Sequence, residues 1–245
     1  MKALMLGLFC LVFTQPIVAA ERIAEQIHEY QLDNGLKLIV NVDNRSPVAV
    51  FTIWYKVGSS YEPAGQSGLS HMLEHMMFKG TRKHPEGEFS RLIAELGGEQ
   101  NAMTGPDMTV YFQKWSNEHI EKSFYYEADR MQNLVLSQQE YEKENKVVQE
   151  ERRLRVDDQP ISLTFERLKA TAHLAHPYHH PIIGWMDDIK NMTLADLTDW
   201  YNTWYAPNNA VIIISGDVKP DNMFTFTRNQ TANGTQAIRY SQSHR

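Results

Sequence analysis

The sequence predicts an α+β fold: a mostly antiparallel β-sheet with helices packed on one side. Short apolar runs rich in β-branched and aromatic residues occur in the N-terminal third of the chain and again near residue 210. Long stretches of helix-forming residues occupy much of the sequence between them. This mixture is typical of helices that are segregated to one face of an antiparallel sheet.

The predicted strands begin with a hairpin over residues 29–42, where two alternating runs flank the turn sequence Asp-Asn-Gly at 33–35. Residues 48–57 form the next predicted strand because they are rich in β-branched and aromatic side chains. Residues 108–115 and the apolar run at 209–215 complete the predicted sheet.

Helices are predicted over residues 67–79, 89–96, 117–134, 138–155, 160–174 and 193–205. The first of these stretches contains no proline and carries enough apolar residues for a buried side. Ser67 is available as its N-cap, and Gly80 follows in the place of a C-terminal cap.

The same helix carries the sequence His-Met-Leu-Glu-His at 71–75. Positions i, i+3 and i+4 share one face of a helix, so His71, Glu74 and His75 would lie together. Two neutral imidazoles can hold zinc, a carboxylate can take a proton from zinc-activated water, and this order is the inverzincin signature. The alternative is a solvated helix face with an incidental histidine pair. Two histidines and a glutamate are unusual in a helix so rich in apolar residues, and metal ligation would explain their presence.

A tetrahedral zinc site with an open position needs a third protein ligand. The predicted helix 138–155 offers Glu144 and Glu151, which lie two turns apart on one face. One carboxylate would bind the metal while the other supports the site from outside. The spacing alone does not decide between this interpretation and a charged, solvated helix face.

Motifs spread over most of the chain after residue 28 are HMLEHMMFKGT at 71–81, GGEQNAMT at 97–104, DMTVY at 107–111, VVQEE at 147–151, DQP at 158–160, YHHPIIG at 178–184, YAPNNA at 205–210 and ISGD at 214–217. Together they resemble the pitrilysin family of zinc peptidases, which includes insulin-degrading enzyme and the mitochondrial processing peptidase. They are far more specific than the five-residue zinc motif. The resemblance implies the same α+β sandwich.

The resemblance assigns one Zn²⁺ ion per chain to His71, His75 and Glu151, and it makes Glu74 the general base. The implied reaction is hydrolysis of a peptide bond by zinc-activated water, and the implied substrate is a peptide or an unfolded polypeptide. Glu74 would take the proton of that water and deliver it to the leaving amine.

The resemblance also assigns two supporting roles. Glu144 matches a carboxylate that orients a ligating histidine through the free ring nitrogen. Asn101 and Ala102 match a segment that holds the substrate backbone as an added strand.

The family's working unit has two similar domains that close around the substrate, and this chain resembles the first of them. We expect residues 21–226 to form the zinc peptidase domain. Residues 227–245 are expected to be a disordered or aberrant tail, because the resemblance ends near Phe224 and the tail has little apolar periodicity. A subunit carrying the second half, or a homodimer, would complete the enzyme.

Two functions stay open: a zinc metalloendopeptidase, and a zinc-binding but catalytically incomplete domain that binds extended peptides or a partner protein.

Residues 1–20 predict a secretory signal peptide, because Lys2 precedes an apolar run and small residues precede the expected cleavage point. The alternative is an uncleaved membrane anchor, although the run is short for a span, and we expect no stable membrane span after cleavage. With the resemblance, the signal predicts the periplasm of a Gram-negative bacterium, or secretion. The single cysteine, Cys10, falls inside this segment, so the mature chain offers no thiolate ligand.

Composition bounds the remaining possibilities. The formal net charge of −6 gives no reason to expect binding to nucleic acid. The histidine-rich stretch 173–180 raises the alternative of a second metal site, but two prolines and the absence of acidic neighbours favour a surface loop. Trp185, Trp200 and Trp204 are expected in the core rather than in a ligand platform.

Overall fold

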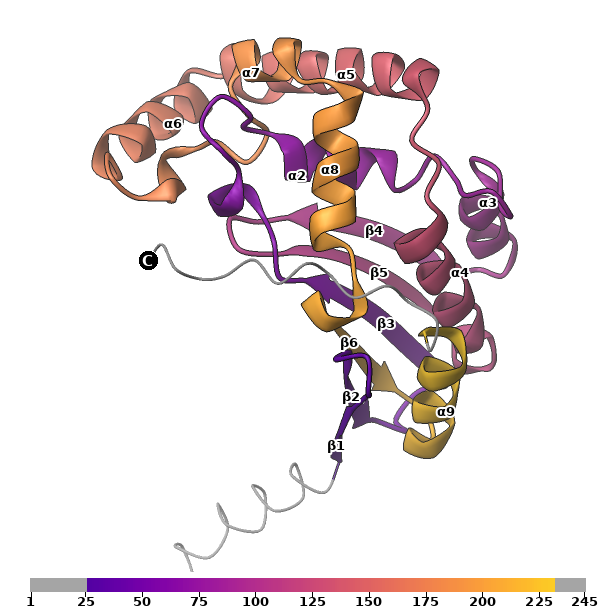
Figure 1. Cartoon of the computed structure of the whole chain (residues 1–245). Coiled ribbons are helices and arrows are strands. Elements are labelled where there is room, and N and C mark those ends of the chain that lie inside the picture. Colours follow the sequence, from indigo (N-terminus) through magenta and orange to yellow (C-terminus); the bar gives the residue numbers. More distant parts are fainter. Residues whose placement is uncertain (1–25, 232–245) are drawn as a thin grey trace, which may run out of the picture.

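The computed structural model describes residues 26–231, so the predicted signal peptide and residues 232–245 of the predicted tail lie outside the described residues. Its centre is a six-stranded sheet with the order β1-β2-β6-β3-β5-β4 (Figure 1). The strands are β1 (Ile27–Gln31), β2 (Lys37–Val42), β3 (Val48–Tyr55), β4 (Glu99–Thr104), β5 (Thr109–Ser116) and β6 (Ala210–Gly216).

The sheet is mixed but mostly antiparallel, which confirms the predicted fold class. Of the described strand pairs, β2 with β6 is parallel and the others are antiparallel. Buried side chains alternate with half-buried ones along β3 and β6, because successive strand residues point to opposite faces and helices cover one face. Ile53 of β3 lies opposite Ile212 of β6 on the covered face, where both are at most 2% exposed.

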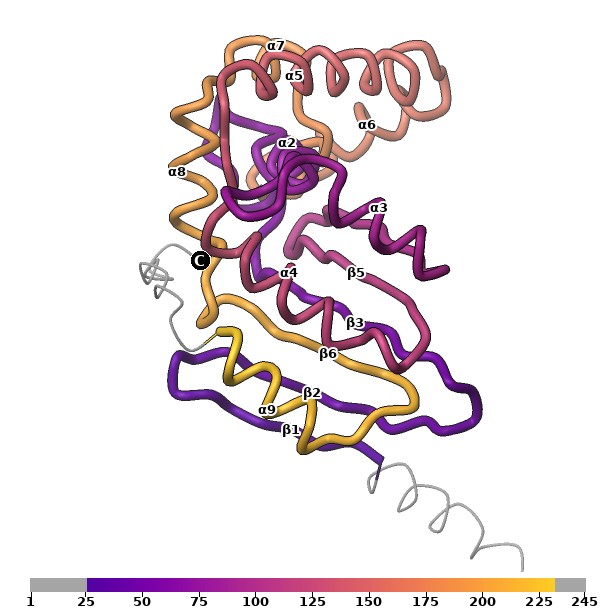
Figure 2. Tube along the Cα trace, turned by 90° about the vertical axis from the view of Figure 1, so that its right-hand side faces the viewer, coloured from indigo at the N-terminus to yellow at the C-terminus, as the bar shows by residue number. Residues whose placement is uncertain are grey.

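The helices are α2 (Leu69–Met76), α3 (Glu88–Glu95), α4 (Ile120–Asn133), α5 (Gln138–Arg152), α6 (Pro160–Ala172), α7 (Met186–Asn191), α8 (Leu194–Trp204) and α9 (Pro220–Thr231). Helix α2 contacts both the edge strand β4 and helix α5, while α4 and α9 pack against the sheet (Figures 1 and 2). None of the helices between residues 26 and 231 combines the length and apolar composition needed to cross a bilayer.

The sequence does not predict β4, α7 or α9. The segment of β4, Glu-Gln-Asn-Ala-Met-Thr, has almost no β-branched or aromatic residues, and it becomes a strand by pairing with β5. Helix α7 is only six residues long. Helix α9 contains three threonines, which have low intrinsic helix propensity, and its contacts with α4 and β2 stabilise it instead.

Helix α9 crosses the boundary predicted at residue 226. Thr227 and Thr231 are 0% and 3% exposed. Each hydroxyl donates to the backbone carbonyl four residues earlier, at 2.8 and 2.7 Å. The prediction of disorder is therefore wrong for residues 227–231.

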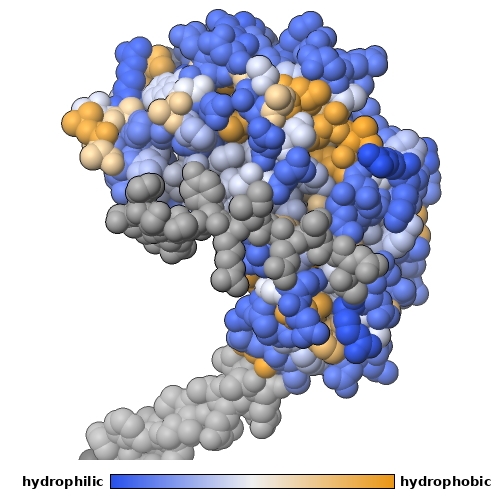
Figure 3. All heavy atoms as spheres, in the orientation of Figure 1, coloured by the Kyte–Doolittle hydropathy of each residue, from blue (hydrophilic) through white to orange (hydrophobic). Residues whose placement is uncertain are grey.

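Helix α6 projects from the body of the molecule and follows a π-helical turn at Arg153–Asp157 (Figure 1). None of its residues is buried, and Ile161, Phe165 and Leu168 are 74, 66 and 60% exposed. Figure 3 shows hydrophobic side chains at this projecting end, at the upper left. Most of the apolar surface of α6 therefore does not pack against the hydrophobic core.

The histidine-rich stretch 173–180 connects α6 to the segment before α7 and is mostly accessible, as a surface loop requires. His180 departs from that prediction because it is 7% exposed. Trp200 and Trp204 are buried as predicted, whereas Trp185 is half-buried.

Candidate metal centre

Helix α2 buries its apolar side and leaves its polar side partly accessible. The buried side chains, each at most 1% exposed, are Leu69, Met72, Leu73 and Met76. His71, Glu74 and His75 are half-buried. The spacing of the apolar positions therefore aims the three polar side chains toward the neighbouring elements β4 and α5.

A buried carboxylate outside the helix holds the start of α2. Gly68 occupies the N-cap position with a φ of 93°, so the cap predicted at Ser67 is wrong. Glu62 accepts hydrogen bonds from the backbone N–H groups of Gly68 and Ser70, each at 2.7 Å. Glu62 is 6% exposed, and burial raises its pKa to about 7. Both oxygens of one side chain thus satisfy free donors in the first turn.

Two glycines let another loop approach the same helix start. A Cβ atom on Gly184 would lie 2.5 Å from the carbonyl oxygen of Ser67, and one on Gly68 would lie 2.7 Å from that of Ile183. Both glycines have positive φ, at 91° and 93°. The loop before α7 therefore rests directly on the backbone at the beginning of α2.

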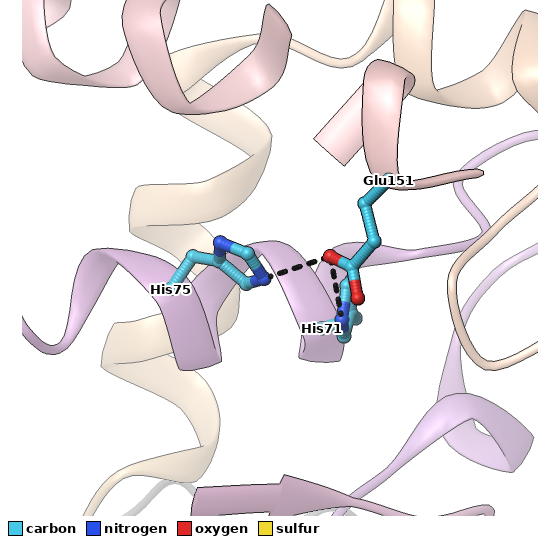
Figure 4. A group of neighbouring side chains, drawn as sticks. All are labelled: His71, His75 and Glu151. Atoms are coloured by element: carbon cyan, nitrogen blue, oxygen red, sulfur yellow. Dashed lines mark ion pairs between the residues drawn. The ribbon is translucent and has the colours of Figure 1, made fainter. Parts of the chain in front are cut away.

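The ligand atoms of three predicted zinc ligands converge. Oε2 of Glu151, which comes from α5, lies 3.7 Å from Nε2 of His71 and 3.3 Å from Nε2 of His75 (Figure 4). Ligand bonds of about 2.0–2.2 Å to a tetrahedral metal place ligand atoms about 3.3–3.6 Å apart. No other group of three such side chains within residues 26–231 brings its ligand atoms within 4.8 Å of one another. The donor set and its spacing fit zinc.

The two histidines have different electrostatic surroundings. Burial, helped by the neighbouring His75, lowers the pKa of His71 to about 4, so its ring is neutral at neutral pH. Burial also lowers the pKa of His75, but hydrogen bonds to Glu151 and Glu144 outweigh it and the net shift is upward. Within the described chain, the buried Nδ1 of His71 has no hydrogen-bond partner. The carboxylates around His75 thus favour a positive charge at this place.

Glu144 lies beside His75 on the side away from Glu151. Its Oε2 is 3.1 Å from Nδ1 of His75, and its Oε1 is 2.5 Å from Nζ of Lys79. Lys79 also donates to Glu86 at 2.9 Å. Burial raises the pKa of Glu144, but the hydrogen bonds of Lys79 and His75 lower it by more. Glu144 is therefore a charged acceptor that fixes the His75 ring with Nε2 facing Glu151.

The C-terminal end of α5 is anchored on both sides of Glu151. Arg155 contacts the second oxygen, Oε1, of Glu151 at 3.1 Å. Arg152 is 4% exposed and donates to both carboxylate oxygens of Glu166 at 2.9 Å and to the carbonyl of Gly184 at 2.7 Å. Arg152 thereby ties the end of α5 to α6 and to the loop that rests on α2.

Glu74 lies against the edge strand β4. The hydroxyl of Thr104 donates to its Oε2 at 2.5 Å. Burial raises the pKa of Glu74, and the Thr104 hydrogen bond opposes this shift. Asn101 and Ala102 lie on the same strand, which pairs with β5 on one side only. All of these residues line one open groove of about 1040 Å³, together with the candidate metal ligands.

Reasoning from sequence misses three residues that the structure brings to this centre. Thr104 and Lys79 fall inside motifs that resemble the family, and this resemblance is the signal that could have found them. Glu62 has no local signal, because a cap that approaches from outside the helix depends on tertiary structure.

The fold and the set of two histidines and one glutamate are those of a class of zinc peptidase domains. In this class the motif reads H-x-x-E-H, the inverse of the commoner H-E-x-x-H. The family model described as Insulinase (Peptidase family M16) matches residues 38–184, and the model described as Peptidase M16 inactive domain matches residues 191–233. The chain belongs to peptidase family M16, the insulinase family. The second match also corrects the expected end of the resemblance near Phe224.

Relatives support this assignment. The zinc protease PqqE of Helicobacter pylori is 41% identical over 198 residues, which cover 80% of this chain and 45% of that protein. The mitochondrial-processing peptidase subunit beta of Bos taurus is 30% identical over 197 residues, covering 80% of this chain and 40% of that protein. The crystal structure of a protease from Helicobacter pylori matches with a TM-score of 0.84 at 38% identity, covering 87% of this chain and 51% of that one. This chain therefore spans about half the length of the relatives it matches.

Proposed function

We propose that this chain is a zinc-dependent metalloendopeptidase domain that hydrolyses peptide bonds in peptides or unfolded polypeptides. One observation carries the proposal: the ligand atoms of His71, His75 and Glu151 converge in a groove that Glu74 also lines. Membership of a family of zinc peptidases supports it.

His71 and His75, each through Nε2, and a carboxylate oxygen of Glu151 would hold one Zn²⁺ ion per chain. Three protein ligands leave a coordination position for water. When bound, zinc lowers the pKa of coordinated water to about 7 and polarises the carbonyl group of the scissile bond. Glu144 contributes by holding Nδ1 of His75, so that Nε2 is directed at the ion.

Glu74 would act as the general base and then as the general acid. The attacking water gives a proton to a carboxylate oxygen of Glu74 as its own oxygen bonds to the carbonyl carbon. The same proton passes to the amine nitrogen as the C–N bond breaks, so no covalent enzyme intermediate is needed. The upward shift of the Glu74 pKa by burial suits this role, because a base works best when its pKa approaches the operating pH.

The open edge of β4 would hold the substrate. Among the described strands β4 pairs only with β5, so its outer edge could bind an extended peptide as an additional strand. The N–H of Ala102 donates to Oδ1 of Asn101 at 2.9 Å and would exchange that bond for one to the peptide. Asn101 and Ala102 lie in the middle of this strand. A peptide added there would run along the groove that contains Glu74 and the candidate metal ligands.

A partner and a location also belong to the proposal. The groove is open, so we propose that a second-half subunit or a second copy of this chain completes the substrate chamber. The predicted signal peptide at 1–20 supports a periplasmic or secreted location.

A second candidate function is a zinc-binding but catalytically incomplete domain that binds extended peptides or a partner protein. The observations that favour it are the converging ligand atoms and the open outer edge of β4, which suffice for binding without turnover. Such a domain would keep the zinc site and the open strand edge but would not turn over substrate.

Cleavage of a mixed library of unstructured peptides distinguishes the two functions. The purified chain, loaded with zinc, is compared with a chelator-treated sample and with Glu74→Gln. We expect zinc-dependent cleavage that falls by about 10²–10⁴ in Glu74→Gln, because one general base contributes about that factor. Zinc content measured by atomic absorption should stay near one ion per chain in the variant.

Each alternative outcome is decisive. Stoichiometric zinc without any cleavage would favour the binding domain. Cleavage by Glu74→Gln at the wild-type rate would show that the general base lies elsewhere.

A further inference from the structure

A hydroxyl at the end of the edge strand reaches the carboxylate of Glu74. Thr104 is the last residue of β4 and is 8% exposed, whereas Glu99, Asn101 and Met103 of the same strand are exposed. Alternation along the strand therefore points Thr104 toward the helix side of the sheet. There its Oγ1 donates to Oε2 of Glu74 at 2.5 Å. Glu74 thus contacts β4 and shares one groove with the candidate metal ligands.

Thr104 is held firmly enough to position another side chain. It ends the strand at a tight turn, where the N–H of Gly105 donates to the carbonyl of Met108 at 2.7 Å. The N–H of Ser59 donates to the carbonyl of Gly105 at 3.2 Å and fastens the turn to the body of the domain. The backbone that carries the Thr104 hydroxyl is therefore held in place. The Glu74 side chain that the hydroxyl binds has several rotatable bonds.

Thr104 interacts with the Glu74 carboxylate through two groups. Its hydroxyl donates to Oε2, and its backbone N–H also stabilises the charged form of the carboxylate. The hydroxyl bond restricts rotation of the carboxylate that would accept the proton. A carboxylate whose rotation is restricted in this way is preorganised for the transfer.

We propose that Thr104 is a positioning residue that fixes the carboxylate of Glu74 and connects it to the strand edge where the substrate backbone would bind. This inference rests on the proposed function, in which Glu74 is the general base. It goes beyond that function because it makes the orientation of the base depend on β4.

Thr109 provides a matched control. It lies directly across from Thr104 in the β4–β5 ladder and is 0% exposed. Its hydroxyl donates to the carbonyl of Val57 at 3.0 Å rather than to Glu74. Thr109→Val therefore removes an equivalent buried hydroxyl from the same end of the β4–β5 hairpin, but not one that binds Glu74.

Steady-state kinetics of Thr104→Val, Thr104→Ser and Thr109→Val with one cleaved peptide test the proposal. We expect kcat of Thr104→Val to fall about tenfold or more, a typical loss when an orienting partner is removed, with KM changed less than twofold. Thr104→Ser should recover most of kcat because it restores the hydroxyl. Zinc affinity, measured by chelator competition, should be the same in all three variants.

A measurement on metal-free protein checks the contact without relying on turnover. With glutamate labelled by ¹³C at the carboxyl carbon, the Glu74 resonance is assigned by its loss in Glu74→Gln. It should shift in Thr104→Val, return in Thr104→Ser and stay in place in Thr109→Val.

The failures can be told apart. Wild-type turnover in Glu74→Gln would overturn the proposed function, while the carboxyl resonance would still report the contact. Loss of turnover in Glu74→Gln together with unchanged kcat in Thr104→Val would overturn only the role of Thr104. Equal losses in Thr104→Val and Thr109→Val would also overturn it, because they would indicate a purely structural effect.

Discussion

Two carboxylates in the groove, Glu74 and Glu151, have pKa values that move in opposite directions. The hydrogen bond from His75 lowers the pKa of Glu151, and the charged form that this favours suits the proposed role of metal ligand. Burial raises the pKa of Glu74 and moves it toward the range of a general base. The surroundings of these two identical side chains thus suit the different roles proposed for them.

Glu62 should make the stability of the domain depend on pH. Its pKa of about 7 in the folded protein lies above the ordinary value of 4.5, so the folded state holds more protons than the unfolded state between these values. The contribution of Glu62 is therefore fully present below pH 4.5 and is lost as the pH rises through about 7. The loss should reach about 3 kcal/mol, since one unit of pKa corresponds to about 1.4 kcal/mol.

Urea unfolding of metal-free protein at several pH values measures this effect. Glu62→Gln should reduce the decline in unfolding free energy across this range by the share of Glu62, because its amide does not titrate, while the raised pKa of His75 keeps its own smaller share. Glu99→Gln, which changes an exposed carboxyl group on β4, should keep the decline. Parallel profiles for the wild type and Glu62→Gln would rule out this assignment.

At the scale of elements, α2 is only eight residues long, so its first turn largely determines where His71 lies. We expect Gly184→Ala to destabilise the fold by about 2–4 kcal/mol, because the new Cβ would meet backbone atoms at the start of α2 and the residue has positive φ. Displacement of that turn should also weaken zinc binding, measured by chelator competition.

Gly65→Ala is the matched control for that variant. Gly65 has a φ of 83°, but a Cβ there would meet nothing within 4 Å. It should cost about 1 kcal/mol from backbone strain alone and leave zinc affinity unchanged. Similar losses of zinc affinity in both variants would show that contact between the loop and α2 does not position His71.

Elements with a strong local pattern are the ones that the sequence predicts. The hairpin of β1 and β2, the strands β3 and β6, and the long helices α4 and α5 follow from periodicity and turn residues. Strand β4 and helix α9 do not, because their residues have weak intrinsic preferences and their neighbours in the fold stabilise them. The N-cap of α2 is Gly68 rather than Ser67, because Glu62, which precedes the helix, accepts from the N–H groups of its first turn.

The candidate site divides in a similar way. The spacing of His71 and His75 predicts a shared helix face, and the family resemblance singles out Glu151 among many acidic residues of α5. Their convergence could be anticipated only from that resemblance, since α2 and α5 are far apart in sequence. Partners such as Thr104 are defined only once the strand and the helix are packed together.

At the scale of the whole molecule, zinc should act as a link between α2 and α5. A ligand present at a thousandfold excess over its Kd stabilises the folded state by about 4 kcal/mol. For a domain of this size that corresponds to a rise in Tm of about 8–16 °C, measured by calorimetry of metal-free protein with added zinc.

Adjacent glutamates supply the control. Glu151→Gln should abolish most of the rise in Tm, because it removes a candidate ligand. Glu150→Gln changes an exposed neighbour that pairs with Arg153, and it should keep the full rise. Equal responses of the two variants would mean that zinc binds elsewhere.

The place of β6 in the sheet has a consequence for biosynthesis. This strand is the last of the six in the chain, yet it lies between β2 and β3, so that Val40 pairs with Ile214. Until residue 216 has left the ribosome, the two parts of the sheet cannot join and the facing edges of β2 and β3 lack their partner. Pairing between such distant segments makes folding slow and exposes nascent chains to aggregation. We therefore expect nascent chains of this protein to depend on chaperones until β6 has been synthesised.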